Sequence, residues 1–210
     1  MYIPFLALYS NYILHSERLL PPLIHFDRVT YRHPGSPEIS QPALNDVSLT
    51  INRGEWVALL GANGSGKTTL ARHCNALLLP SSGKIFIDGQ DTAEKTFIPQ
   101  IRALVGMVFQ NPEDQMVSTV IEEDTAFGPE NLGIPSLEIQ KRVASSLDAV
   151  AMSKYKHRPP HLLSAGQMQR VALAGVLAMR PECVIFDEST AMLDPQGRLD
   201  VLETMRRLHE

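Results

Sequence analysis

The chain has 210 residues, of which 44% are hydrophobic and 20% are charged, and its net charge at pH 7 is −4. A chain of this length can bury a full core without disulfides. The acidic balance gives no electrostatic footprint for nucleic acid, so no nucleic-acid partner is expected. The two cysteines lie in apolar runs and the seven histidines lack metal-ligand spacing. We therefore expect reduced core thiols rather than a disulfide or a metal centre.

The first 22 residues differ from the rest of the chain. They are apolar as far as Leu14, then polar, and they end at Pro21 and Pro22. They lack a basic start, and their apolar part is too short to span a bilayer. We expect a loose extension over residues 1–22, in preference to an anchor, and one domain over residues 23–210.

Three strand-like segments follow. Ile24, Phe26 and Val29 alternate with polar residues, which predicts a strand, and residues 43–51 predict another. Residues 84–87 end at Asp88 and Gly89, which is a hairpin signal. Together these segments predict three strands and a hairpin at the start of the domain.

Residues 56–68 predict a phosphate site. Residues 56–60 are continuously apolar, as in a buried parallel strand, and residues 61–68 read GANGSGKT, which fits G-x-x-x-x-G-K-[ST]. A helix is expected over residues 69–79, ending before Pro80. Glycines let the backbone wrap around phosphates, Lys67 would reach the β- and γ-phosphates, and the Thr68 hydroxyl would bind Mg²⁺. The expected nucleotide-binding positions are Gly61, Asn63, Gly64, Ser65, Gly66, Lys67, Thr68 and Thr69.

Residues 111–163 predict a helical insert. Thr119 and Glu122 fit a capping box, and an apolar face follows Pro135 at residues 139, 143, 147 and 150. Residues 163–167 read LSAGQ and begin a further helix, expected to run to Met179, with Ser164 as its N-cap. The free N–H groups there would suit a phosphate, which would have to come from a partner subunit. The alternative is an ordinary capped helix.

Residues 183–186 predict a second buried strand that ends at Asp187 and Glu188. Ligands of open parallel sheets bind at the carboxyl ends of the strands. Asp187 is therefore placed to hold magnesium through water, and Glu188 is placed to orient and deprotonate an attacking water. The alternative is a solvated acidic pair.

The order of these motifs resembles the ATP-binding cassette superfamily, and residues 163–167 resemble its LSGGQ signature. Residues 108–115 and 122–133 look like the ATPase subunits of energy-coupling-factor importers, which take up vitamins, cobalt or nickel. The resemblance runs from about residue 23 to the last residue. It implies an α/β fold, with a P-loop NTPase core, an N-terminal antiparallel β-subdomain and a helical subdomain over about residues 111–163.

The resemblance also implies roles for single residues. Tyr31 would stack on adenine, although a half-buried strand tyrosine is the alternative. Gln110 would touch the magnesium and the attacking water and relay the nucleotide state to a membrane subunit. Across a dimer, Asp194 would bridge the two sites, and the γ-phosphate bound by the opposite subunit would be covered by Ser164, Gly166 and Gln167.

Two departures from the family pattern stand out. Ala165 occupies a position that is usually glycine, and the family continues into another strand with a switch histidine, whereas this chain ends at Glu210. His209 does not fill that role, because no strand precedes it. We therefore expect a poorly active and marginally stable chain.

The leading hypothesis is an ATPase motor subunit at the cytoplasmic face of the membrane, using ATP and Mg²⁺. Its partners would be a second ATPase subunit, a transmembrane coupling subunit and a substrate-binding membrane subunit. One alternative is a soluble cassette ATPase acting on nucleic acid or ribosomes. The insert is too short for the coiled coil of repair members, and only one cassette is present. Another alternative is a fragment that binds nucleotide without turnover.

Overall fold

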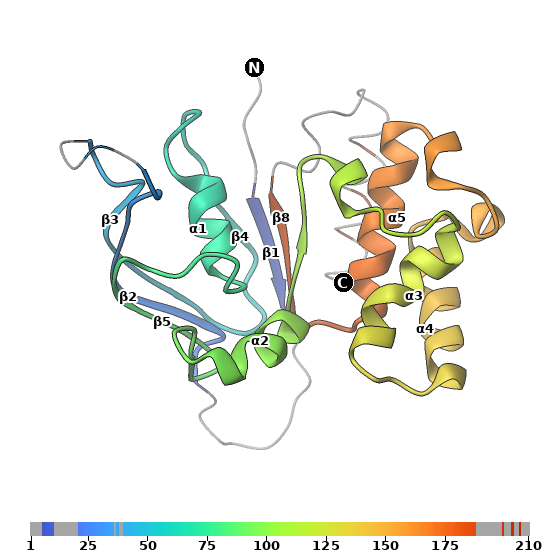
Figure 1. Cartoon of the computed structure of the whole chain (residues 1–210), viewed down its shortest axis with the longest axis horizontal. Coiled ribbons are helices and arrows are strands. Elements are labelled where there is room, and N and C mark those ends of the chain that lie inside the picture. The colour runs from blue at the N-terminus through green and yellow to red at the C-terminus, as the bar shows by residue number, and fades with distance from the viewer. Residues whose placement is uncertain are drawn as a thin grey trace.

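The computed structural model describes residues 6–10, 21–35, 37, 40–187, 199, 203 and 206. These residues form an antiparallel sheet, a second sheet in the middle, and a group of helices on the far side of the second sheet (Figure 1). We call the antiparallel sheet of residues 24–31, 44–51, 82–87 and 90–91 the β-subdomain, and the middle sheet the core sheet. The helices at residues 121–131, 136–149 and 165–178 form what we call the helical subdomain.

The β-subdomain is built around β2 (Ile24–Tyr31), which pairs with β3 (Leu44–Ile51) and with β5 (Ser82–Ile87). A two-residue turn then leads into β6 (Gln90–Asp91). The turn residues Asp88 and Gly89 have φ values of 51° and 76°. Left-handed backbone at both positions is what a tight hairpin requires, so the predicted hairpin is confirmed.

The core sheet has the strand order β4 (Val57–Ala58), β1 (Leu6–Ser10), β8 (Cys183–Asp187) and β7 (Val105–Val108). Strands β7 and β8 are parallel, whereas β1 is antiparallel to both of its neighbours. The sequence predicted a loose extension over residues 1–22, but five of these residues form a strand in the structure. Only two of residues 56–60 pair with β1, and β4 is correspondingly short.

Helix α1 (Lys67–His73) follows β4, and α2 (Ile98–Leu104) precedes β7. The helix expected over residues 69–79 therefore begins earlier and is shorter. Its end is explained by Ala76, whose φ of 54° is incompatible with a continuing α-helix. Short 3₁₀ turns lie at Lys95–Phe97, Pro112–Gln115, Ser153–Tyr155 and Pro160–Leu162.

The helical subdomain consists of α3 (Ile121–Asn131), α4 (Ser136–Ala149) and α5 (Ala165–Ala178). The predicted apolar face of α4 is buried. The capping box predicted at Thr119 and Glu122 is wrong, because Val120 is the N-cap and has no side-chain bond. The Asp124 carboxylate instead accepts the N–H groups of Val117 (2.7 Å) and Ser118 (2.9 Å), which orders the entry to α3.

The core sheet separates two hydrophobic clusters. Cys183 and Ile185 pack with the β-subdomain and α1, whereas Val184 and Phe186 pack with the helical subdomain. This alternation follows from the period of two in a strand. Both cysteines are buried thiols, as predicted, and burial raises the pKa of the Cys74 thiol. In the described part of the chain, no helix has the length and apolar character needed to cross a membrane.

Candidate nucleotide-binding site

The glycine loop connects β4 to α1 at the edge of the core sheet. Gly64 and Gly66 have φ values of 80° and 92°. A Cβ atom at Gly66 would lie 2.4 Å from the carbonyl oxygen of Ala43, which is a severe clash. The second fixed glycine of the motif is therefore required both by its backbone conformation and by the close approach of the β-subdomain.

Lys67 lies inside this loop, and its residue surface is only 7% exposed. Its ammonium group donates hydrogen bonds to the carbonyl oxygens of Gly61 (3.1 Å) and Ala62 (2.9 Å). The lysine thus holds a positive charge at the centre of the loop, where the N–H groups of a glycine-rich turn form an anion-binding concavity. A phosphate group is the anion that this combination suits.

Thr68 joins the loop to the end of β8. Its hydroxyl donates a hydrogen bond of 2.8 Å to Oδ1 of Asp187, and Asp187 is 3% exposed. Hydroxyl, carboxylate, phosphate and water oxygens are the ligands that Mg²⁺ prefers at nucleotide sites. No group of three His, Cys, Asp or Glu side chains that could hold a metal occurs among the described residues. The Thr68–Asp187 pair fits a magnesium ion, which would take further oxygen ligands from a phosphate and from water.

Gln110 is exposed and lies two residues beyond β7. The pairing of Val108 with Phe186 places it at the same sheet edge as Asp187. Two further glutamines hold this segment. Gln115 accepts the Phe109 N–H group (2.8 Å), and Gln169 of α5 donates to the Phe109 carbonyl oxygen (3.1 Å).

Sequence reasoning missed both supporting glutamines. Gln169 is 1% exposed and lies among the apolar residues of α5. A polar side chain on an otherwise buried helix face is a recognisable signal, because such a group needs a hydrogen-bond partner. Its contact means that the helical subdomain directly holds the segment leading to Gln110.

Tyr31 does not face the loop. It is 6% exposed, and its ring meets His33 and His73 edge to face at centroid distances of 5.0 and 4.7 Å. The structure thus favours the alternative of a buried strand tyrosine over adenine stacking. The exposed ring beside the loop belongs to His33, whose Nε2 is 3.3 Å from the Thr69 hydroxyl. The sequence feature that could have identified His33 is its aromatic ring, two residues beyond the end of β2.

A cavity of about 570 Å³ connects His33 with the glycine loop. Its described lining comes from residues 32–33, from residues 41–43 before β3, and from residues 64–69 of the loop and α1. The structure therefore brings most of the predicted loop residues together with His33. Tyr31 is not among the residues that line this cavity.

The predicted signature residues lie elsewhere, at the beginning of α5. The Ser164 hydroxyl accepts the Gln167 N–H group (3.3 Å), and the Gln167 side chain accepts the Ser164 N–H group (3.0 Å). This is a capping box, so the predicted N-cap is confirmed. Ala165 is the first helical residue and has no positive φ. An alanine therefore fits this position without backbone strain.

The structure does not bring the signature residues to the cavity of the glycine loop, whose described lining includes none of them. Glu188 and Asp194 lie outside the described residues. Their predicted roles stay predictions.

A glycine loop wrapped around a buried lysine, and bonded to an aspartate at the end of a neighbouring strand, is the arrangement of a P-loop NTPase. The ABC transporter family model matches residues 44–191. The chain therefore belongs to the ABC transporter family.

Two relatives are named as the energy-coupling factor transporter ATP-binding protein EcfA1. The protein from Symbiobacterium thermophilum is 61% identical over 167 residues, covering 80% of this chain and 58% of that protein. The protein from Clostridium novyi is 53% identical over 188 residues, covering 90% and 67%. The chain thus spans about three fifths to two thirds of the length of these relatives.

Two solved structures share the fold. One is cbiO1 from Clostridium perfringens, described as part of the ABC transporter complex cbiONQ, with a TM-score of 0.77, 35% identity, and coverage of 90% of this chain and 74% of that one. The other is the ATP-binding cassette MJ0796, a dimer in a post-hydrolysis state with ADP and phosphate. Its TM-score is 0.75 and its identity 26%, over 89% of this chain and 83% of that one.

Proposed function

We propose that this chain binds and hydrolyses Mg-ATP as a motor subunit of an energy-coupling-factor importer for a vitamin or a transition-metal ion. The observation that carries the proposal is the 2.8 Å contact between Thr68 and Asp187, directly beside the buried Lys67. It joins the loop expected to hold phosphates to the carboxylate expected to hold magnesium. The names of the relatives support the choice of importer class.

Each residue has a separate task in this proposal. Lys67 exchanges its loop carbonyl partners for the β- and γ-phosphate oxygens, and Thr68 and Asp187 hold the magnesium ion. The magnesium ion supplies positive charge that neutralises the transferred phosphoryl group. Gln110 orients the attacking water from the adjoining strand end, and Glu188 accepts its proton.

The adenine base is assigned to His33 in place of Tyr31. The His33 ring is exposed and lines the loop cavity, whereas the Tyr31 ring packs behind it. An aromatic face stacks on any base without needing particular hydrogen bonds. Thr69 bonds to His33 and so couples the base side of the cavity to α1.

The signature residues Ser164, Gly166 and Gln167 act on the nucleotide of a second ATPase subunit, together with Asp194. Within the described residues they do not line the cavity of their own glycine loop, which supports a contribution to another subunit's site. The description of MJ0796 as a dimer agrees with such an arrangement.

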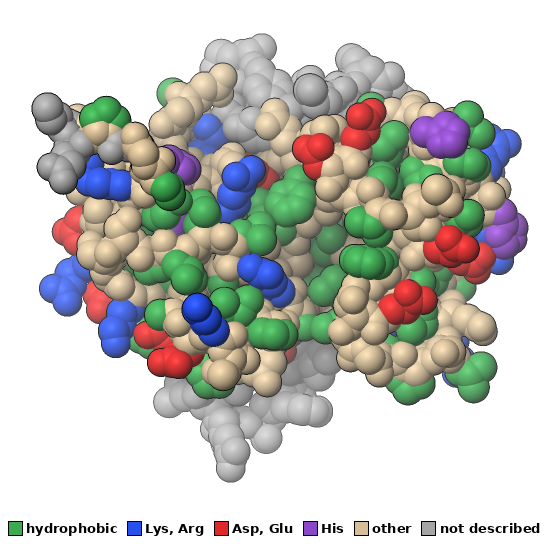
Figure 2. All heavy atoms as spheres, in the orientation of Figure 1, with side chains coloured by type: hydrophobic (Ala, Val, Ile, Leu, Met, Phe, Trp, Pro, Cys, Tyr) green, Lys and Arg blue, Asp and Glu red, His purple; other side chains and the backbone are tan. Residues whose placement is uncertain are grey.

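A membrane partner is assigned to a groove between the core sheet and the helical subdomain. Its cavity is about 230 Å³ and is lined by residues of α2, β7, α3 and α5, including the exposed Val117 and Phe127. Figure 2 shows hydrophobic side chains in this hollow. A short amphipathic helix of a transmembrane subunit would fit there. Gln115 lines the groove and bonds to Phe109, which connects the groove to Gln110.

Replacing Lys67 by Ala tests the nucleotide site. The variant loses the buried charge on the phosphates, so we expect a loss of ATP affinity of at least about 100-fold, which corresponds to about 2.7 kcal/mol. Labelled-ATP titration of the full chain measures it. The exposed Lys84 provides the matched control, and Lys84→Ala should bind as the unaltered chain does.

A second variant separates ATP binding from ATP hydrolysis. Glu188→Gln keeps the shape of the side chain but removes its basicity, so this variant should bind ATP and release phosphate slowly. Equal ATP affinity in Lys67→Ala and in the unaltered chain would contradict the assignment of the glycine loop as the nucleotide-binding site.

Crosslinking tests the membrane partner. A cysteine introduced at Val117, which is 59% exposed beside the groove, should crosslink to a transmembrane subunit in assembled membranes. A cysteine at Leu137, an exposed residue in the first turn of α4 that does not line the groove, is the control and should not crosslink. Crosslinks from position 117 to soluble proteins alone would favour a soluble cassette ATPase instead.

A further inference from the structure

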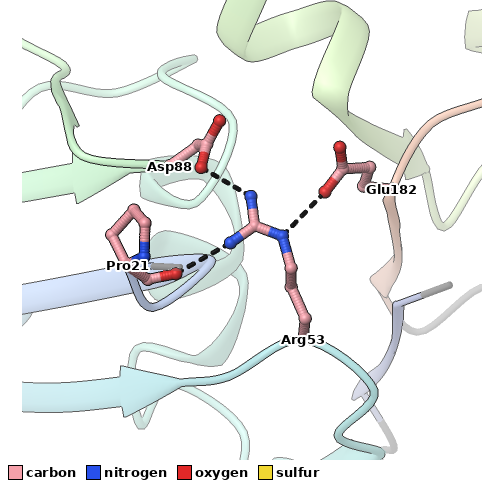
Figure 3. A network of polar contacts seen from close by, with 4 residues as sticks. All are labelled: Pro21, Arg53, Asp88 and Glu182. Carbon is pink, nitrogen blue, oxygen red and sulfur yellow. Dashed lines mark hydrogen bonds and ion pairs between the residues drawn. The ribbon is translucent and has the colours of Figure 1, made fainter. Parts of the chain in front are cut away.

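One arginine links the β-subdomain to the core sheet (Figure 3). It lies before β4 and beside the beginning of β8, whereas the glycine loop follows β4 and contacts the end of β8. Arg53 lies between β3 and β4, and its side chain is only 11% exposed. Its guanidinium group donates to the Asp88 carboxylate at 2.5 Å, to the Pro21 carbonyl oxygen at 2.7 Å and to the Glu182 carboxylate at 3.0 Å.

The three partners come from separate segments. Pro21 precedes β2, and Asp88 lies in the β5–β6 turn, where its N–H group also donates to the Leu23 carbonyl oxygen at 2.9 Å. Glu182 directly precedes β8, and its N–H group donates to the carbonyl oxygen of Leu104, just before β7. One side chain therefore joins two strand ends of the β-subdomain to the beginnings of β7 and β8.

The same strands lead to the candidate site at their other ends. β2 leads to His33, and β8 ends at Asp187. Apolar packing also holds the two sheets together, but hydrophobic contact has no preferred direction. Charge-assisted hydrogen bonds from a planar guanidinium group do fix a direction. The Arg53 contacts are thus suited to set the angle of the β-subdomain on the core sheet.

We propose that Arg53 is a positioning residue for nucleotide binding, which sets the place of His33 relative to the glycine loop. The proposal rests on the proposed function, in which the base lies against His33 and the phosphates lie in the loop. Because Arg53 acts on the orientation of the β-subdomain, its loss should weaken contacts to the base while leaving the phosphate contacts of Lys67 and Thr68 intact.

Loss of the arginine should leave the fold intact. The Asp88 and Glu182 side chains are 34% and 42% exposed, so water can solvate them when the guanidinium is removed. Severe destabilisation follows when a charge is left buried without a partner, and neither carboxylate is in that position. Arg53→Met also keeps the apolar stem of the side chain in place.

The test compares two ligands on the full chain, Mg-ATP and Mg-tripolyphosphate, which lacks the base and the sugar. For Arg53→Met, we expect ATP affinity to fall about tenfold, equivalent to about 1.4 kcal/mol, with tripolyphosphate affinity unchanged. Asp88→Asn and Glu182→Gln each break one half of the bridge and should reproduce the selective loss. These two variants also test the positioning role if Arg53→Met does not fold. Arg53→Lys, which keeps the charge but lacks the fork, should recover part of the ATP affinity.

The control is Lys84→Met, which removes an ion pair with Asp91 that lies wholly inside the β-subdomain. It should leave the ratio of the two affinities unchanged. Equal losses for ATP and tripolyphosphate in the Arg53, Asp88 and Glu182 variants would overturn the positioning role, as would unchanged affinity for both. If the unaltered chain binds neither ligand, the proposed function itself fails, and this inference fails with it.

Discussion

The glycine loop and the beginning of α5 are both polar regions, but their internal contacts differ. In the loop, Lys67 bonds to backbone carbonyl groups and Thr68 bonds to Asp187, 119 residues away in sequence. At α5, Ser164 and Gln167 bond to each other within one turn. The comparison teaches that the first region is assembled by the tertiary fold, whereas the cap of α5 forms within one turn, with one further bond from the Gln167 amide to the Tyr155 hydroxyl (3.4 Å).

The difference has a consequence for ligand binding. In the proposed function, the loop would exchange its own hydrogen bonds for those of a phosphate and a metal ion. The capping box leaves the Ser164 and Ala165 side of α5 exposed and needs no rearrangement to meet a partner. A prearranged surface loses little conformational entropy on association. This favours α5 as a rigid lid over a second subunit's nucleotide.

Replacing Ser164 probes the beginning of α5 and is expected to have a larger effect than the His73 substitution described below. Ser164→Ala removes an N-cap, which costs about 0.5–2 kcal/mol of stability. It also removes the proposed contact to the partner's γ-phosphate, and hydrogen bonds to charged groups contribute about 1.5–3 kcal/mol. Turnover of the dimer should therefore fall about 10- to 100-fold, while ATP binding to the chain's own loop stays unchanged. Thermal unfolding, ATP titration and phosphate release measure the three quantities.

Ser164→Asp separates capping from catalysis. Aspartate caps a helix as well as serine does, so stability should be retained, but its negative charge should repel the partner's phosphate and abolish turnover. If Ser164→Asp keeps full turnover, the beginning of α5 does not face a nucleotide, and the ordinary capped helix is the correct interpretation.

Local patterns in the sequence predicted the parts of the fold that local interactions determine. The hairpin at Asp88 and Gly89 depends on backbone conformations of the turn residues themselves, and the cap of α5 depends on Ser164 and Gln167 within one turn. The strand Cys183–Asp187 is apolar enough to be recognised alone. These elements were predicted correctly because the residues that determine each of them lie within the element itself.

Other parts depend on contacts between distant segments. The choice between Tyr31 and His33 is made by which ring packs on His73 of α1, a contact that no local pattern shows. The end of α1 is set by the left-handed backbone of Ala76, a residue type that ordinarily favours helix. Strand β1 pairs with β4 and β8, which come 49 or more residues later in a sheet whose order the sequence does not reveal.

The smallest expected effect concerns His73 of α1, which is completely buried and packs against the Tyr31 ring. Burial lowers the pKa of His73, although its Nδ1 donates a hydrogen bond of 2.7 Å to the Thr69 carbonyl oxygen. In the unfolded chain the pKa returns to about 6.5. As the pH falls below that value, the unfolded chain gains a proton that the folded chain does not, so stability decreases.

His73→Gln keeps an N–H donor for Thr69 but cannot titrate, so it isolates this contribution from the carboxylates that also respond to acid. The stability of the unaltered chain relative to the variant should decrease as the pH falls from about 7.5 through 6.5 to about 5.5, with a slope that approaches about 1.4 kcal/mol per pH unit below the unfolded pKa. Urea unfolding of both proteins across this range provides the measurement. If the two stability curves stay parallel, His73 is not held neutral in the fold, and the packing of Tyr31, His33 and His73 beside the loop is looser than the structure shows.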